Sequence, residues 1–145
     1  MALPLVVGSD HAGFLLKERL KKALDRLGIA YRDVGTDSTE RVDYPDFARQ
    51  VAEAVSKGEA ARGLLVCGSG QGMAMAANRH RGVRAALAWD EETARLAREH
   101  NDANVLALGG RLIDPALAER ILEVFLKTSF AGGRHAGRVA KIDSR

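Results

Sequence analysis

The sequence predicts an α/β protein built on a five-stranded parallel sheet, and three observations support this fold class. Short apolar runs alternate with longer segments of helical periodicity. Glycine or aspartate stands where the chain is expected to turn between them. The later runs are apolar almost throughout, which is typical of parallel strands buried on both faces. Together these features indicate a Rossmann-like three-layer α/β/α sandwich.

The first half of the chain predicts three strands and two helices. Leu5–Gly8 is a short apolar run ending in glycine, and residues 29–34 alternate like a second strand. Between them, residues 14–27 are apolar at positions 16, 20, 24 and 27, a helical spacing closed by Gly28. A second helix begins at Tyr44-Pro45, because proline suits the first helical turn, and ends before Gly58. Residues 63–67 form the third strand.

The second half predicts two further strands, over 84–89 and 104–109, and three helices. A short helix over 72–79 is rich in alanine and methionine. Asp90 caps the next helix, which runs to about His100 and has two glutamates in its first turn. Asp114-Pro115 opens a helix that continues to about Thr128. The tail, about 129–145, is rich in glycine and arginine.

Composition points to one domain, residues 1–145, of an ordinary globular protein. The chain is 46% hydrophobic and 28% charged, and its net charge of +3 is too mild to indicate nucleic-acid binding. The lone cysteine cannot form an intrachain disulfide, which favours a reducing compartment. The sequence shows no signal peptide and no apolar run near the roughly 20 residues that span a membrane. We therefore expect a cytoplasmic protein with no membrane partner.

Reactive side chains follow several of the predicted strands. Ligands of open α/β sheets bind beyond the carboxyl ends of the strands. Segment 8–13, "GSDHAG", follows the first strand, "CGSGQG" at 67–72 ends the third, and "GGR" at 109–111 ends the fifth. The free amides of a glycine loop that precedes a helix form an anion site. Met73 stands where a dinucleotide fingerprint needs its last glycine, so a nucleotide site is a weak alternative.

Cys67, the only cysteine, stands at the start of this glycine loop. A thiol at a helix N-terminus is stabilised as the thiolate, which suits a reactive group. The same position also suits a small buried hydrophobic residue at a strand end, and the sequence leaves both interpretations open. A metal site is not indicated, because one cysteine and scattered histidines show no ligand spacing.

Histidines and arginines elsewhere in the chain allow two interpretations each. His11 is either a turn residue or part of the site, and His100-Asn101 either caps a helix or takes part in the chemistry. Arg134 and Arg138 are four residues apart and could share a helical face. They are either solvated charges or, with Arg111, a phosphate clamp, since guanidinium groups bind phosphate through paired hydrogen bonds.

Taken together, these segments resemble the ribose-5-phosphate isomerase B family of sugar-phosphate isomerases. The likeness covers nearly the whole chain. The motifs appear in order: "GSDHAGF", "GT" followed by "ER" and "DYP", "CGSGQG" followed by "AAN", "HNDANVLALGGR" and "GGRHAGRV". Each is modest alone, but jointly they are specific.

The resemblance implies an aldose–ketose isomerase of the non-oxidative pentose phosphate pathway. Such an enzyme interconverts ribose 5-phosphate and ribulose 5-phosphate through an enediolate, with no cofactor and no metal. It further implies homodimers or homotetramers whose active sites are completed across the subunit interface, with tail 129–145 reaching a partner. One branch of the family has a glutamate base just after the loop, where this chain has Met73, so the resemblance is to the cysteine type.

The resemblance also implies roles for individual residues. Cys67 is expected to be the base that moves a proton between C2 and C1, assisted by the Ser69 hydroxyl, and His100 the acid/base that opens the sugar ring. The residues expected to bind substrate include Tyr44, which packing alone could also explain. They are Asp10, His11, Tyr44, Gly68, Ser69, Gly70, Gln71, Gly72, Asn101, Arg111, Arg134 and Arg138.

Two other functions stay open at this point. An isomerase of a hexose 6-phosphate, such as allose or galactose 6-phosphate, would use similar residues in a deeper pocket. A non-catalytic nucleotide-binding module is weaker, because Met73 breaks the fingerprint.

Overall fold

A computed structural model describes residues 2–144 and has the predicted layered architecture. Five parallel strands form one sheet in the order β2-β1-β3-β5-β4. The strands are β1 (Leu3–Ser9), β2 (Tyr31–Asp33), β3 (Ala60–Cys67), β4 (Ala85–Leu87) and β5 (Val105–Gly109). The helices are α1 (Phe14–Leu27), α2 (Tyr44–Ser56), α3 (Gln71–Ala77), α4 (Glu91–Asn101), α5 (Pro115–Lys127) and α6 (Arg134–Asp143).

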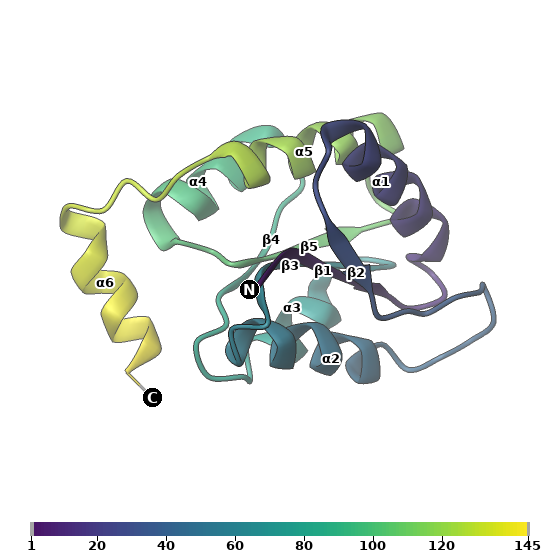
Figure 1. Cartoon of the computed structure of the whole chain (residues 1–145), viewed down its shortest axis with the longest axis horizontal. Coiled ribbons are helices and arrows are strands. Elements are labelled where there is room, and N and C mark those ends of the chain that lie inside the picture. Colours follow the sequence, from purple (N-terminus) through teal and green to yellow (C-terminus); the bar gives the residue numbers. More distant parts are fainter. Residues whose placement is uncertain (1, 145) are drawn as a thin grey trace.

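The sheet lies between two layers of helices. Helices α1, α4 and α5 cover one face, and α2 and α3 cover the other (Figure 1). Side chains of a strand alternate between the faces. In β3, Leu64 and Val66 pack into the first layer, whereas Leu65 and Cys67 pack into the second. Cys67 therefore ends its strand on the face covered by α2 and α3.

Strand β1 extends over Leu3–Ser9 rather than residues 5–8, and three other strands depart from the predicted bounds for local reasons. Strand β4 has only three residues, because the Trp89 amide already donates to the Thr93 side chain at the start of α4. Strand β3 begins three residues earlier than predicted, at Ala60. Its Arg62, which breaks the apolar run, bonds with the Phe125 carbonyl oxygen at 2.8 Å. Strand β2 is shorter, because the Ile29 amide still bonds to the Leu24 carbonyl oxygen beyond the end of α1.

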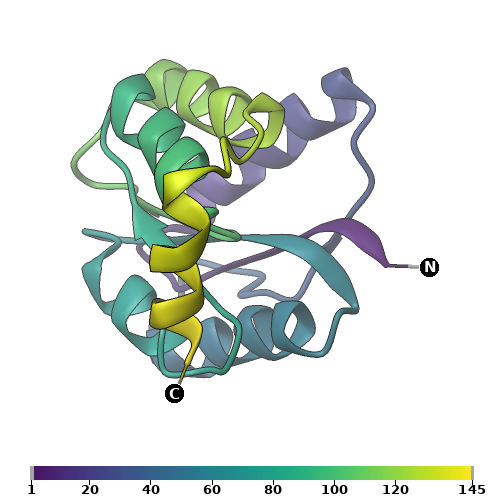
Figure 2. The same ribbon diagram turned by 90° about the vertical axis from the view of Figure 1, so that its left-hand side faces the viewer.

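The tail contains a sixth helix that the sequence analysis did not assign. Helix α6 stands apart from the sandwich beside the end of α4 (Figures 1 and 2). Ala131 donates its amide to the Glu99 carbonyl oxygen, and the His100 and His135 rings stack with centroids 4.3 Å apart. The tail is therefore an ordered arm at the C-terminal end of α4.

The sheet order places a crevice between β1 and β3. Strand β2 lies on one side of β1, and all later strands lie on the other, so the connections diverge at this point. Ligand sites of such sheets form beyond the carboxyl ends of the two diverging strands. Those ends carry Asp10 and Cys67, and the Asp10 amide bonds to the Val66 carbonyl oxygen at 3.2 Å. No helix among residues 2–144 is long and apolar enough to cross a membrane.

A close backbone approach at Gly13 yields a stability prediction. A Cβ at Gly13 would lie 2.2 Å from the Val66 carbonyl oxygen, too close for any side chain. We expect Gly13→Ala to lower the free energy of unfolding by about 3 kcal/mol, since overpacking of rigid backbone displaces both segments. Urea unfolding followed by circular dichroism measures the change.

Gly28→Ala is the matched control for Gly13→Ala. Gly28 has φ +70° and no neighbour within 4 Å of its added Cβ, so only left-handed backbone strain of about 1 kcal/mol is expected. Equal losses from the two variants would contradict the proposed clash.

Candidate active site

A cavity of about 500 Å³ lies at the carboxyl edge of the sheet, over the β1–β3 crevice. Its wall is formed by the exits of β1, β3 and β5 and by the start of α2. The lining residues are Asp10, His11, Ala12, Tyr44, Cys67, Gly68, Ser69, Gly72, Arg111 and Leu112. Eight of them were predicted site residues; Ala12 and Leu112, which offer no polar chemistry, were not.

Cys67 is buried at the base of this cavity, with 5% of its surface exposed. Its Sγ accepts a hydrogen bond from the Gly70 amide at 3.1 Å. The loop can turn back on the thiol because Gly70 has φ +80°, and a Cβ there would lie 2.6 Å from Leu87. The glycine is therefore required, and it directs an amide at the sulfur.

Two amides of the glycine loop donate to side chains within the loop, one to the Cys67 sulfur and one to the Ser69 hydroxyl. Gly70 serves the thiol, and the Gln71 amide donates to the Ser69 Oγ at 3.4 Å. Gly68, Ser69 and Gly72 line the cavity, whereas Gln71 is exposed at the start of α3. The Tyr44 ring lies against Gly72, where a Cβ would be 2.5 Å from the ring, so this glycine makes room for the tyrosine.

Asp10 and His11 line the cavity from the exit of β1, and each accepts a backbone amide. Asp10 is buried, and its Oδ1 accepts the Gly13 amide at 3.0 Å. His11 Nδ1 accepts the Val42 amide at 3.2 Å. A neutral imidazole that accepts at Nδ1 carries its proton on Nε2, so His11 presents a donor from its other nitrogen.

Arg111 reaches the cavity from the exit of β5. Its amide bonds to the Gly68 carbonyl oxygen at 3.0 Å, and Gly110 bonds in the same way to Cys67 at 2.7 Å. The guanidinium Nη1 lies 3.5 Å from the position a Gly68 Cβ would take. The exposed Arg111 makes no ion pair among residues 2–144, so its charge is available to an anion.

Four predicted site residues lie elsewhere in the chain. His100 and Asn101 end α4, which precedes β5, and Arg134 and Arg138 are on α6. They therefore lie at the amino edge of the sheet, whereas Cys67 pairs with Gly109 at the carboxyl edge. At about 3.3 Å per residue, β5 alone separates these edges by about 13 Å. One chain does not bring the two groups of residues together.

The described part of the chain offers no metal centre. Within residues 2–144, no group of three or more His, Cys, Asp or Glu side chains is placed to hold a metal ion. The chemistry available at the cavity is that of a thiol, a carboxylate, an imidazole and backbone amides.

Comparison with known proteins gives a consistent result. A family model described as "Ribose/Galactose Isomerase" matches residues 5–142. Ribose-5-phosphate isomerase B of Escherichia coli is 44% identical over 95% of this chain and 93% of its own length. A crystal structure of a ribose 5-phosphate isomerase from Thermotoga maritima superposes with a TM-score of 0.96, at 50% identity and with complete coverage of both chains.

The chain belongs to the ribose/galactose isomerase family. The resemblance inferred from the sequence motifs is confirmed, and so is the α/β fold class. A third relative, the ribose-5-phosphate isomerase B of Mycoplasma genitalium, was solved with bound ribulose-5-phosphate. It is 41% identical, with a TM-score of 0.94 over 99% of this chain and 96% of its own. These matches span nearly the full length of this chain and of the three relatives.

The ring beside His100 is one feature that sequence reasoning missed. His135 stacks on His100 with an interplanar angle of 15°. Partial burial lowers the pKa of His135, and the charges of His100, Arg134 and Arg138 lower this pKa further. The available signal was the position of His135 between the two arginines.

The lowered pKa of His135 predicts a pH dependence. A histidine whose pKa is lower in the folded state stabilises the fold above the unfolded pKa of about 6.5, and this contribution is lost as the pH falls. NMR titration of the His135 ring should give a pKa below that reference value, and His100→Asn should raise the pKa by removing a cationic neighbour. A His135 pKa that is unchanged in His100→Asn would contradict the assigned cause.

Proposed function

We propose that this protein interconverts ribose 5-phosphate and ribulose 5-phosphate, with Cys67 as the base. The observation that supports this most directly is the buried Cys67 thiol at the base of the cavity, facing a glycine loop and an unpaired arginine. The Escherichia coli and Thermotoga maritima relatives named above are ribose-5-phosphate isomerases. The comparisons give the nucleotide-binding alternative no support.

The proposed reaction is a proton transfer next to a carbonyl group. Cys67 thiolate removes the proton from C2 of the open-chain aldose, which leaves an enediolate, and the thiol returns the proton to C1 while the hydroxyl proton moves from O2 to O1. Loop amides and the Ser69 hydroxyl stabilise the enediolate oxygen, an effect worth about 3–4 kcal/mol per donor in comparable oxyanion sites. The Gly70 amide instead bonds to the sulfur, which stabilises the negative charge of the base.

In this mechanism a partner subunit supplies the four site residues that lie away from the cavity, which are His100, Asn101, Arg134 and Arg138. Cys67 and His100 must each lie about 3 Å from the atom of one bound sugar on which it acts, which their places at opposite edges of the sheet do not allow within one chain. A two-fold dimer would bring the His100 end of one chain to the Cys67 cavity of the other, twice over. Exposed apolar side chains support such contact: Leu112, which lines the cavity, is 71% exposed, and Met75 on α3 and Trp89 after β4 are 67% and 59% exposed.

In this composite site, His100 opens the sugar ring and Asn101 holds the substrate. Arg134 and Arg138 are exposed and, like Arg111, make no ion pair among residues 2–144. The three guanidinium groups would bind the phosphate, remote from the reacting carbons. Binding energy at the phosphate then serves to position C1 and C2 against the thiol.

Isomerisation in D₂O tests the base. Wild-type protein should convert ribose 5-phosphate and incorporate deuterium at the transferred position. Cys67→Ala should still bind substrate but lose at least about 10³-fold in kcat, because no other group at the sulfur's position can take the proton. Cys67→Ser, which keeps a hydroxyl, is the size-matched control and should also be severely impaired.

Near-full activity of Cys67→Ala would overturn the assignment and make Asp10 the next candidate base. Parallel assays with allose 6-phosphate and galactose 6-phosphate test the substrate. A higher kcat/KM with either one would contradict the five-carbon assignment.

Mixing two inactive variants tests the shared site. If Cys67 and His100 of different chains form one site, a heterodimer of Cys67→Ala with His100→Asn contains one intact site. Equal mixing and re-association should therefore restore about a quarter of the wild-type activity. Sites formed within one chain would leave the mixture as inactive as its components, and that result would reject the composite site.

A further inference from the structure

Helix α6, which carries Arg134 and Arg138, has few contacts that fix its position. Within the described chain its one buried side chain is Val139. A cavity of about 660 Å³ lies between α6 and the loop before β4, so the helix does not pack tightly on the body. Isolated helices of this length are marginal in water. The orientation of the two arginines therefore depends on a small number of specific anchors.

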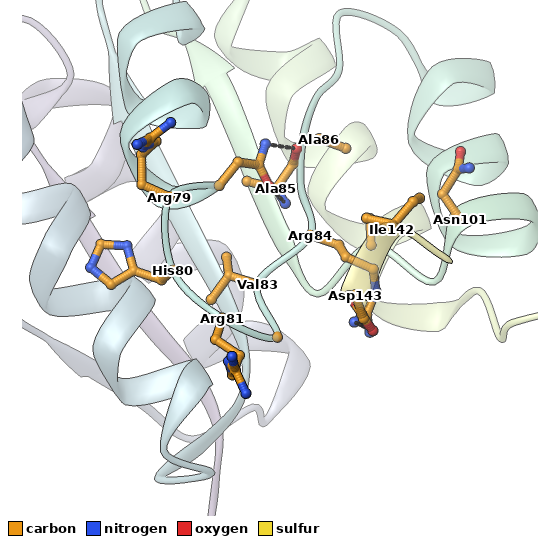
Figure 3. A pocket seen from close by; sticks show the side chains of 13 residues that line it. Arg79, His80, Arg81, Val83, Arg84, Ala85, Ala86, Asn101, Ile142 and Asp143 are labelled. Atoms are coloured by element: carbon orange, nitrogen blue, oxygen red, sulfur yellow. Dashed lines mark hydrogen bonds and ion pairs between the residues drawn. The ribbon is translucent and has the colours of Figure 1, made fainter. Parts of the chain in front are cut away.

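Arg84 supplies one of these anchors. It lies just before β4, and its side chain is only 15% exposed. Its Nη1 contacts the Asp143 carboxylate, at the last residue of α6, at 2.8 Å. Figure 3 shows Arg84 and Asp143 together on the cavity wall, with Ile142 beside them.

The same guanidinium also holds the turn that follows His100 and Asn101. Arg84 Nε donates to the Asp102 carbonyl oxygen at 2.9 Å, and Nη2 lies 3.5 Å from the Asp102 carboxylate. Asp102 adopts a left-handed conformation with φ +48°, which a non-glycine residue keeps only when its surroundings fix it. Arg98 braces the other side of Asp102, with Nη1 2.9 Å from its Oδ1.

We propose that Arg84 is a positioning residue that fixes α6 and the His100–Asn101 turn as one unit for delivery to the partner's cavity. This inference rests on the proposed function, because it concerns where the acid and the phosphate-binding arginines are presented. Arg84 itself touches no substrate. Arg84 fixes the position of α6 through its contact with Asp143. It fixes the positions of His100 and Asn101 through its contacts with Asp102.

Three variants of the full-length protein separate these two effects. Asp143→Asn removes the charge at α6 and leaves the Asp102 contacts of Arg84 in place. Arg84→Met removes the contact with Asp143 and the contacts with Asp102. Arg120→Met is the matched control, because Arg120 makes a comparable ion pair with Glu91 at 3.0 Å on the outside of α4 and α5.

The measurements are KM and kcat for ribose 5-phosphate, the competitive inhibition constant of inorganic phosphate, and amide hydrogen exchange of residues 134–143. We expect Asp143→Asn to exchange faster over α6 and to raise KM and the phosphate inhibition constant about threefold, with kcat within twofold. Arg84→Met should raise both constants further and lower kcat about tenfold, because misplacing the acid affects the chemical step. A fourth variant, Asp143→Glu, keeps the carboxylate and should give values close to those of the wild type.

Two results would overturn the inference. The first is faster exchange over α6 with no change in KM or in phosphate inhibition, which would make the anchor merely structural. The second is an equal effect of Arg120→Met. A wild-type protein that does not isomerise ribose 5-phosphate would instead overturn the proposed function. In that case phosphate binding measured by calorimetry, with the exchange data, still decides whether Arg84 positions the α6 arginines.

Discussion

The hydrogen bonds between the exits of β1, β3 and β5 are the constraint on which the rest of this site depends. Asp10 bonds to Val66, Gly110 to Cys67, and Arg111 to Gly68, all through the backbone. These contacts fix the three loops relative to one another without using any side chain. The side chains of Asp10, Cys67 and Arg111 are therefore not needed to hold the three loops to one another, and all three residues line the cavity. Rigid strands supply the positions, and short loops supply the chemistry.

The glycines of these loops make such close contacts possible. At Gly13 the first turn of α1 touches the backbone of β3, and at Gly70 the loop turns back to the Cys67 sulfur. At Gly72 the missing side chain is replaced by the Tyr44 ring. Each glycine thus has its own steric reason, and together they bring the backbone close to the space where a substrate would bind.

Local sequence signals predict most of the fold, and the elements and bounds that they do not predict have identifiable causes. Apolar periodicity and helix caps predict ten of the eleven elements, because buried parallel strands and amphipathic helices have distinct patterns. Helix α6 was not assigned, since half of "RHAGRVAKID" is charged or histidine and the position of the helix depends on contacts with Glu99, His100 and Arg84. Strand β3 is longer than predicted because Arg62 is held by a tertiary contact with the Phe125 carbonyl oxygen. Strand β4 is shorter because the Trp89 amide bonds to Thr93 at the start of α4.

The candidate site was predictable only in part for a similar reason. Residues that follow β1, β3 and β5 meet at one edge, as the parallel topology requires. The separation of His100 from Cys67 depends on which edge each residue reaches, and the motifs alone do not show it. The Arg84–Asp102–Asp143 network is still harder to find, because its members are far apart in sequence and none stands in a recognisable catalytic motif.

The stack of His100 on His135 links proton binding at the end of α4 to anion binding on α6. Two imidazoles with centroids 4.3 Å apart, next to two guanidinium groups, cannot both be cationic without strong repulsion. A proton on His100 therefore disfavours a proton on His135, in line with the lowered pKa of His135. Arrival of a phosphate dianion at Arg134 and Arg138 would relieve that repulsion and favour uptake of a further proton. Under the proposed function, substrate phosphate and a proton on His135 would then bind cooperatively, each favouring the other.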